Sequence, residues 1–551
     1  MKKKIKLILI STLVLIILSI IYYLIFLPTL SIKFLSGVFF IAIFVIIEFG
    51  IIALSLSNDN VGQVGNINKI TKVWIMTTIT IAILIFLGII LGSPIFNSKK
   101  MYNQIGDVKE EAFVDNITQL SNEGIPTVDI QLAYKQGEKT LGSVSGLGSQ
   151  VTLGKFTMQQ VNGKLIYVAP LEHSGFFKWV SNKTTPGYIT VSATDANDVK
   201  LVQEINGEKI NLKYLESSFF AEDLVRYIKL SGNITEGVTD YSFELDDTGR
   251  PYYVVTKYTN TIFFGTPEAI GTVICDVQTG EIAEYSIEET PLWVDRIVPE
   301  KFIENQIYNF GEYVHGVFNF SNKDKLIKTD GMIIVYNDNN CYYYTGLTSV
   351  GSDEAVVGFL MTNTRTKETT KFTMGGATEN AAMMSAEGLV QDMGYTATIP
   401  VPINLNGIPT YFMTLKDVEG LIKSYALVNI ENYSIAVTGS NISEAKRNYI
   451  GKLSSIGNDN NLSNNNSKEK IEGVVTIISS NIENGNTSYY MILNNDTTKL
   501  YVAPYTISEE LPITRENDKV SIEYIDTKLG AIAITEFNNL NYTQESSNKL
   551  Y

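Results

Sequence analysis

Residues 34–57 read FLSGVFFIAIFVIIEFGIIALSLS, and Glu48 is the only ionisable residue in this stretch. An apolar run of about 20 residues or more is long enough to cross the roughly 30 Å hydrocarbon core of a bilayer as a helix. Two further runs of this kind lie at residues 5–27 and 73–92. The sequence therefore predicts a three-helix membrane anchor in residues 1–93. Because a carboxylate inside a span is costly and often functional, Glu48 is a candidate binding residue.

The lysines predict the orientation of these helices. Residues 2–6 hold four lysines, and basic residues favour the cytoplasmic side of a membrane. With a cytoplasmic N-terminus, residues 28–33 form an outside loop, residues 58–72 form an inside loop, and residues 94–551 are extracytoplasmic. Lys99 and Lys100 oppose this orientation. A cleaved signal peptide fits less well, because the first run is too long and no small-x-small site follows it.

The composition excludes several classes of protein. The chain has 551 residues, a net charge of -15, two cysteines and two histidines. Two cysteines cannot form a disulfide scaffold, and we expect Cys275 and Cys341 to be free thiols in buried strands. His173 and His315 lie far apart, so no metal site is expected. Since nucleic-acid binding depends on cationic contacts to phosphate, no nucleic-acid partner is expected either.

The region after the anchor, residues 94–210, is predicted to be β-rich and membrane-proximal. Residues 94–116 are polar and are predicted to form a stalk or a short helix. Stretches rich in β-branched and aromatic residues, separated by Gly or Asn, then predict strands. These lie at residues 127–133, 150–158, 164–169 and 188–192.

Three successive segments share one order of elements, a helix followed by antiparallel strands. They are residues 211–295, 296–375 and 376–454. Antiparallel strands joined by Asn, Asp or Gly turns form a sheet with one face for the helix to cover. Each segment has an aromatic pair in a strand, and alternation predicts that one ring is buried and its neighbour exposed. The pairs are Tyr252–Tyr253, Tyr343–Tyr344 and Tyr411–Phe412.

The first segment carries a recognisable hairpin. The run Cys275-Asp-Val-Gln-Thr-Gly-Glu-Ile resembles the V-D-x-x-T-G-x-V hairpin of PepSY domains, small α+β modules of bacterial exported proteins that are often linked to peptidase regulation. The second segment keeps the turn but has Lys367 in place of Gly, and the third, at residues 429–433, departs further. The resemblance covers residues 215–440 and implies no catalytic residues.

The end of the chain divides into a linker and a small barrel. The Asn-rich residues 455–470 have almost nothing to bury and are predicted to be a linker. Five short strands in residues 471–540 predict a small β-barrel that resembles the OB fold. The fold class is thus α+β: three transmembrane helices, three helix-plus-sheet units that resemble PepSY domains, and a C-terminal barrel.

The candidate site residues after Glu48 cluster in residues 293–315. They are Trp293, Asp295, Arg296, Tyr313 and His315, with the acidic residues Glu300, Glu304 and Glu312 among them. Glu300 and Glu304 share one helical face, as do Glu312 and His315, and such pairs could serve acid–base chemistry. A solvated helix face with an Asp295–Arg296 pair near its start is the simpler interpretation.

The sequence favours a non-catalytic binding or scaffold protein of the bacterial cell envelope. The membrane and another envelope protein are its expected partners, and no cofactor, metal or catalytic residue is predicted. Two alternatives stay open. One is an envelope enzyme that uses the acid–base residues of residues 293–315. The other is a membrane sensor or assembly factor that depends on Glu48.

Overall fold

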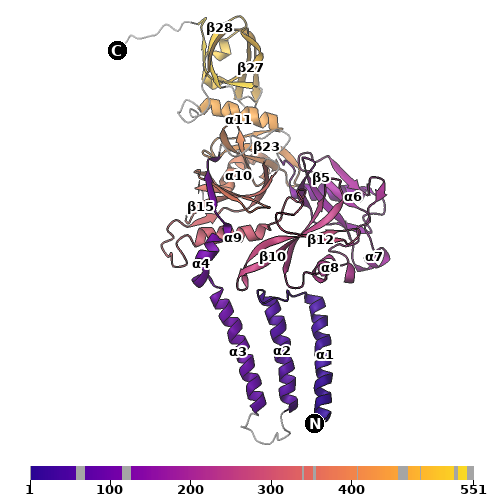
Figure 1. The fold of residues 1–551 in the computed structure, drawn as a ribbon. Helices are drawn as coiled ribbons and strands as arrows, with labels where there is room; N and C mark the ends of the chain where they lie inside the picture. The colour runs from indigo at the N-terminus through magenta and orange to yellow at the C-terminus, as the bar shows by residue number, and fades with distance from the viewer. Residues whose placement is uncertain are drawn as a thin grey trace.

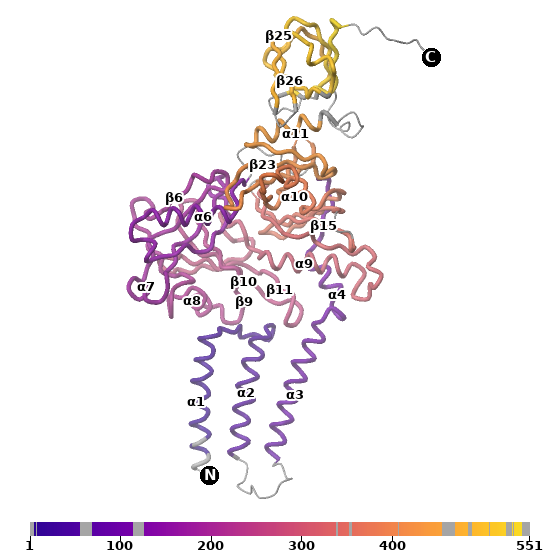
Figure 2. Tube along the Cα trace, turned by 180° about the vertical axis from the view of Figure 1, so that it is seen from behind, coloured from indigo at the N-terminus to yellow at the C-terminus, as the bar shows by residue number. Residues whose placement is uncertain are grey.

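The computed structural model describes residues 2–56, 69–113, 126–337, 340–351, 355–405, 407–456, 469–483, 486–525 and 531–542. The fold is mixed α+β: three N-terminal helices lie at one end, stacked sheets follow, and a small barrel lies at the other end (Figures 1 and 2).

The three predicted apolar runs are confirmed as helices long and apolar enough to span a membrane. They are α1 (Lys2–Phe26), α2 (Leu35–Leu56) and α3 (Lys69–Leu91). α2 contacts both of its neighbours, and the indole Nε1 of Trp74 on α3 donates to the carbonyl of Ile46 on α2 at 2.9 Å. Most apolar side chains of these helices point outward, as expected for helices surrounded by lipid.

The elements from α4 to α11, residues 94–456, form the α+β part of the protein, which contacts the ends of these helices. The backbone N–H of Leu30, in the loop between α1 and α2, donates to the carbonyl of Ile234 at 2.8 Å. The buried Lys229 donates to the hydroxyl of Thr29 in the same loop at 2.9 Å. The first loop, the end of α1 and the end of α3 therefore lie on one side, the side that carries the rest of the chain (Figure 1).

The first sheet has the order β2-β4-β5-β6, with β3 also paired to β4. Helix α6 covers it, and Leu132, Ala133 and Leu141 lie in its core. The predicted strand at residues 127–133 is wrong, because the chain there enters α6, which Asp129 caps by accepting from the N–H of Leu132 at 3.0 Å. The bounds are α6 (Ile130–Ser143), β2 (Val151–Leu153), β3 (Thr157–Val161), β4 (Lys164–His173), α7 (Phe176–Ser181), β5 (Tyr188–Ser192), β6 (Val199–Val202), β7 (Glu204–Ile205) and β8 (Glu208–Lys209).

The second sheet is an antiparallel meander in the order β12-β11-β10-β9. Leu224 and Ile228 of α8 pack into the core that this sheet shares with the first one. Cys275 lies in that core as a free, buried thiol, and Cys341 in the next sheet is also free and buried, as expected. The bounds are η2 (Phe220–Glu222), α8 (Leu224–Leu230), β9 (Gly237–Leu245), β10 (Pro251–Ile262), β11 (Gly265–Asp276) and β12 (Ile282–Tyr285).

The third sheet has the order β1-β18-β17-β15-β13, with β14 also paired to β15. Its first strand comes from residues 94–116, where the sequence predicts a stalk or a short helix; the helix forms, and the chain then continues into β1, parallel to β18. The bounds are α4 (Pro94–Tyr102), η1 (Asn103–Ile105), β1 (Val108–Glu111), α9 (Glu300–Glu312), β13 (Leu326–Lys328), β14 (Ile333–Asn337), β15 (Asn340–Ser349), β16 (Ala355–Val356), β17 (Gly358–Asn363) and β18 (Thr369–Phe372).

The fourth sheet has the order β20-β22-β23-β24, with β21 also paired to β22. Thr378 caps α10 by accepting from the N–H of Ala381 at 3.2 Å. The bounds are β19 (Gly376–Ala377), α10 (Glu379–Gly388), η3 (Gln391–Met393), β20 (Thr396–Ala397), β21 (Val401–Leu405), β22 (Ile408–Lys416), β23 (Ile422–Asn429), β24 (Ala436–Gly439) and α11 (Ile442–Ile456).

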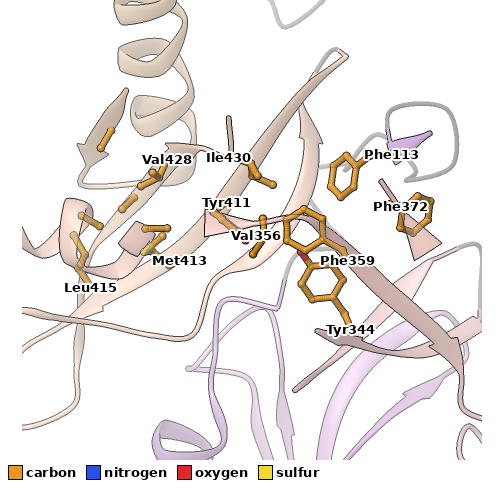
Figure 3. Packing of buried hydrophobic residues seen from close by; sticks show 14 of the residues in the cluster. Phe113, Tyr344, Val356, Phe359, Phe372, Tyr411, Met413, Leu415, Val428 and Ile430 are labelled. Atoms are coloured by element: carbon orange, nitrogen blue, oxygen red, sulfur yellow. The ribbon is translucent and has the colours of Figure 1, made fainter. Parts of the chain in front are cut away.

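The aromatic pairs show that the third and fourth sheets are covered on both faces. Tyr343 packs with α9, whereas its neighbour Tyr344 packs between the two sheets, where its ring stacks on Phe359 at 5.3 Å (Figure 3). Tyr411 lies in the same inter-sheet core, and Phe412 packs against α11. Both rings of these two pairs are buried, so the predicted exposed partner is wrong here. Only Tyr252 is partly exposed beside a buried Tyr253.

The C-terminal strands form a closed barrel in the order β25-β26-β27-β29-β28. It lies at the end opposite the three apolar helices (Figure 2), and α11 contacts both this barrel and the fourth sheet. The predicted Asn-rich linker falls largely outside the described residues. The bounds are β25 (Glu469–Glu483), β26 (Asn486–Leu493), β27 (Asp496–Pro504), η4 (Tyr505–Ile507), η5 (Leu511–Ile513), β28 (Lys519–Ile525) and β29 (Ala531–Asn539).

Candidate functional site

A cavity of about 1040 Å³ lies where the four larger open sheets meet. Edge strands form part of its wall, since β3, β9, β14, β20 and β21 each pair with one described strand only, and the interior strand β22 contributes as well. A sheet edge presents unpaired backbone N–H and C=O groups to whatever lies beside it. Each of these strands contributes residues to the wall, among them Thr157, Asp240, Ile334, Thr396 and Val401.

A β-bulge shapes the part of this wall that β9 forms. The pairing of β9 with β10 shifts at Asp240 and Tyr241, which together lie opposite Val255. Asp240 has a left-handed backbone with φ of 54°. Bulges re-aim side chains and are common next to functional sites, and here Asp240, Tyr241 and Ser242 all face the cavity.

Asp295 and Gln159 hold β3 and β9 in place beside the cavity. Asp295 accepts from the backbone N–H of Gln160 at 2.6 Å and from the hydroxyl of Tyr336 at 3.0 Å. It therefore ties β3 to β14. The side chain of Gln159 is buried and bonds to both backbone polar groups of Leu245 at the end of β9. Both residues thus satisfy edge groups that would otherwise be left open.

Arg296 lies in the cavity wall and Glu244 lies behind it. The guanidinium donates to the hydroxyl of Ser242 at 3.4 Å. Glu244 is 1% exposed, and the hydroxyl of Ser242 lies beside its carboxyl group. Burial raises the pKa of Glu244 to about 8, although the positive charge of Arg296 opposes the rise. At neutral pH Glu244 is thus mainly a neutral acid beside a permanent cation.

The remaining charges of the cavity have both signs. Lys416 forms an ion pair with Asp129, and Asp417 pairs with Lys423 at 3.2 Å. Lys155 also lines the wall. Apolar side chains separate these groups; they include Phe156, Met158, Ile333, Met383 and Phe412. A mixed lining of this kind suits a ligand that has both polar and apolar groups.

A smaller lobe of about 350 Å³ adjoins the cavity, and the two share Lys155, Thr157 and Tyr241 in their walls. Glu172 in this lobe accepts from the N–H of Ser217 at 3.0 Å and from the hydroxyl of Tyr253 at 3.2 Å. Burial raises the pKa of Glu172, and the hydrogen bonds from Ser217 and Tyr253 oppose that rise.

Two further ionisable groups of the lobe also have shifted pKa values. Burial and the neighbouring Glu172 raise the pKa of Glu216. Burial lowers the pKa of His173, whose ring Nε2 is buried and has no hydrogen-bond partner among the residues that the structure describes. Clustered, oppositely perturbed acids and bases in a cleft are candidates for proton transfer.

The structure separates the predicted residues of the 293–315 segment. Trp293 packs against Tyr252 with the two rings tilted and their centroids 5.3 Å apart, outside the cavity wall. Tyr313 lies beyond α9, at the end opposite Arg296, beside Tyr308 with ring centroids 6.5 Å apart. Of the predicted group, Arg296 and Glu300 line the cavity, and Asp295 lies beside it between β3 and β14.

Glu300 and Glu304 are near enough to interact, since burial and the neighbouring Glu304 raise the pKa of Glu300. The other acid–base candidates of this segment form ion pairs. Glu312 pairs with Lys325 at 2.6 Å, and the exposed His315 pairs with Asp324 at 2.8 Å. Glu304 pairs with Lys328 at 3.2 Å. The loop after α9 supplies Asp324 and Lys325, and β13 supplies Lys328. Glu312 and His315 therefore each pair with a residue outside α9, rather than with one another.

Glu48 lies between two of the apolar helices. Its Oε1 accepts from the hydroxyl of Thr12 on α1 at 2.5 Å, and its Oε2 is buried with no hydrogen-bond partner in the described part of the chain. This contact joins α1 to α2 within the span, as expected for a polar group in an apolar helix.

Sequence reasoning missed Glu244, Glu172, Glu216 and the bulge in β9. The sequence gives no signal for Glu244, because its alternation with Phe243 and Leu245 predicts an exposed side chain. Nothing in the sequence shows that this side chain meets Arg296. No protein-family model matches the chain, and a search of curated proteins finds no match.

Proposed function

We propose that this chain is a membrane-anchored, extracytoplasmic binding protein of the bacterial cell envelope, and that its cavity receives an extended segment of another envelope protein. The convergence of sheet edges on one cavity carries the proposal. An extended polypeptide binds an exposed edge by adding main-chain hydrogen bonds, and its alternate side chains enter flanking pockets. The cavity supplies both the edges and a mixed polar and apolar lining.

The proposed orientation places the N-terminus in the cytoplasm and residues 94–551 outside. The lysines of residues 2–6 support it through the positive-inside rule. In the same proposal, the helix-plus-sheet units are PepSY-like modules, which is supported by the order of α8 before β9–β12. The terminal barrel is OB-like and makes contact with protein rather than nucleic acid, in keeping with the acidic chain.

Photocrosslinking in cells tests the binding proposal. Val418 lines the cavity and is 96% exposed, so a benzoyl-phenylalanine there reaches any occupant without disturbing the core. Leu292 is 90% exposed and lies outside the cavity wall, which makes it the matched control. We expect a protein adduct from position 418 and none from position 292. Equal adducts from both positions, or none from position 418, would contradict the proposal.

The smaller lobe supports a second candidate function, an envelope enzyme that uses acid–base chemistry. A carboxylic acid with a raised pKa can donate a proton, and a neutral imidazole can accept one. Glu216 and His173 have these properties. In this version, Glu216→Gln abolishes turnover while the protein stays folded. A cellular phenotype that survives Glu216→Gln and is lost on blocking the cavity with Val418→Trp would favour binding alone.

A further inference from the structure

An exposed aromatic patch lies on the side of the α+β part that faces the three apolar helices. It consists of Phe176, Phe177 and Val180 of α7 and Phe220 of η2, which are 40%, 81%, 50% and 66% exposed. The rings contact one another, with centroids 5.7 Å apart for Phe176 and Phe177 and 6.4 Å apart for Phe176 and Phe220. Contiguous exposed apolar side chains of this kind mark an interaction surface.

A single guanidinium places this aromatic patch at the end of a membrane span. Nε of Arg226 donates to the carbonyl of Leu24, in the last turn of α1, at 3.2 Å. Nη1 of the same side chain donates to the carbonyl of Phe220 at 2.9 Å. Phe220 therefore lies beside the last turn of α1, and its ring contact with Phe176 joins α7 to the same place.

The hairpin between β10 and β11 reaches the same level on the other side. A Cβ atom added at Gly88, near the end of α3, would lie 2.9 Å from the ring of Phe264, and one at Gly92 would lie 3.2 Å from Cβ of Phe263. Phe263 is 46% exposed. The hairpin tip thus packs against the last turn of α3, at the depth where an apolar span ends.

Three apolar residues near the ends of the apolar helices have a strained backbone. Leu27, Phe220 and Phe263 have φ angles of 46°, 56° and 48°. They are the apolar residues among the non-glycine residues with positive φ in the described ranges. A left-handed backbone costs a bulky residue free energy, and such outliers persist where the surroundings require them. All three lie where the chain leaves the apolar helices or touches their ends.

The surroundings of the patch have the chemistry of a membrane interface. Trp179 lies beneath the exposed rings, its indole N–H donates to Glu222 at 2.9 Å, and Lys183 lies over its ring. Lys178 lies on the same helix. Aromatic residues with neighbouring lysines are enriched at the headgroup level, where apolar rings meet acyl chains and cations meet phosphates.

We propose that the aromatic patch inserts into the headgroup region of the leaflet in which α1 and α3 end. The α+β part then contacts the bilayer directly, in addition to its contacts with the ends of the apolar helices. This contact holds the first sheet, and the cavity wall that it forms, at a fixed height above the lipid. The inference is independent of what the cavity binds.

A fluorescent label tests this insertion in the full-length protein reconstituted into nanodiscs of phosphatidylcholine and phosphatidylglycerol. The dye NBD is attached at Phe177→Cys and, separately, at Val180→Cys. The control is Ile482→Cys, which replaces another exposed apolar residue, 72% exposed, in the barrel at the far end. The native thiols are buried, and the unsubstituted protein measures their background.

We expect the labels at 177 and 180 to emit at shorter wavelength than the label at 482. They should be quenched several-fold more strongly by spin-labelled lipid and several-fold less by aqueous iodide. Equal iodide quenching at all three positions would overturn the proposal. A second result would also overturn it: labels at 177 and 180 that are protected from iodide only at high protein concentration and are not quenched by spin-labelled lipid. A second copy of the protein, rather than the bilayer, would then cover the patch.

Discussion

The side-chain amide of Gln159 on β3 hydrogen-bonds to both backbone polar groups of Leu245 on β9, as a neighbouring strand would. Its Nε2 donates to the carbonyl of Leu245 at 2.6 Å, and its Oε1 accepts from the N–H of Leu245 at 2.9 Å. One amide side chain thereby joins the edges of two sheets beside the cavity. The cavity depends on this junction, because β3 and β9 form adjacent parts of its wall.

Gln159→Leu should destabilise the protein by about 2–4 kcal/mol, since it leaves two buried backbone groups of Leu245 without partners. The control is Gln203→Leu, at an exposed position. Denaturant unfolding in detergent, followed by tryptophan fluorescence, measures the difference. Equal stability of the two variants would show that the Gln159 bridge contributes nothing.

Glu244 should make stability depend on pH. Its pKa is about 8 in the folded chain against a usual value of 4.5, so the folded state holds a proton that the unfolded state has lost. This contribution is complete below about pH 4.5 and is lost as pH rises through about 8.

Glu244→Gln should remove that part of the pH dependence, because the amide keeps the shape and cannot ionise. The variant should be more stable than the wild type at pH 8 and should differ from it less at pH 5, by about 1.4 kcal/mol for each unit of pKa shift. Unfolding curves at the two pH values measure this. Parallel pH profiles would contradict the assignment of Glu244 as a buried neutral acid.

The two thiols should be unreactive in the folded protein. Burial raises the pKa of both Cys275 and Cys341 to about 12, and the thiolate is the reactive form. Neither should react with a maleimide until denaturant is added, and both should then react. Modification of either thiol under native conditions, or a disulfide between them, would contradict their buried, reduced state.

Thr12→Val should weaken the contact between α1 and α2 by about 1 kcal/mol, a common value for an interhelical hydrogen bond in a membrane. The control is Thr77→Val on α3, because the Thr77 hydroxyl bonds to the carbonyl of Val73 on its own helix. Steric-trapping unfolding in bicelles measures both. An equal loss of stability in the two variants would show that the hydrogen bond between Thr12 and Glu48 does not stabilise the contact between α1 and α2.

The sequence predicts elements whose cause is local and misses those whose cause is distant. The apolar helices follow from run length alone. The helix at Ile130–Ser143 was also within reach, because Asp129 is a good N-cap and apolar residues recur at helical spacing after it. The burial of Tyr344 beside the buried Tyr343 could not be predicted, because it depends on the fourth sheet covering the second face of the third sheet.

The candidate site was only partly predictable for the same reason. Asp295 and Arg296 stand out as an adjacent charged pair. However, Asp295 bonds to Gln160, 135 positions away, and to Tyr336, 41 positions away. The spacing of Glu312 and His315 would place them on one helical face. Their actual partners, Lys325 and Asp324, come from the following loop, whose position cannot be predicted from sequence periodicity. Side-chain type identified candidates, and sheet packing decided which of them meet.

The most direct test of the binding account maps crosslinks from several walls of the cavity. Benzoyl-phenylalanine is placed in turn at Met158 on β3, Ile334 on β14 and Thr396 on β20, which all line the cavity. An extended segment rises about 3.3 Å per residue, so all three adducts should map to one short, contiguous stretch of a single partner protein. Adducts that scatter over unrelated proteins, or the absence of adducts at all three positions, would contradict the account.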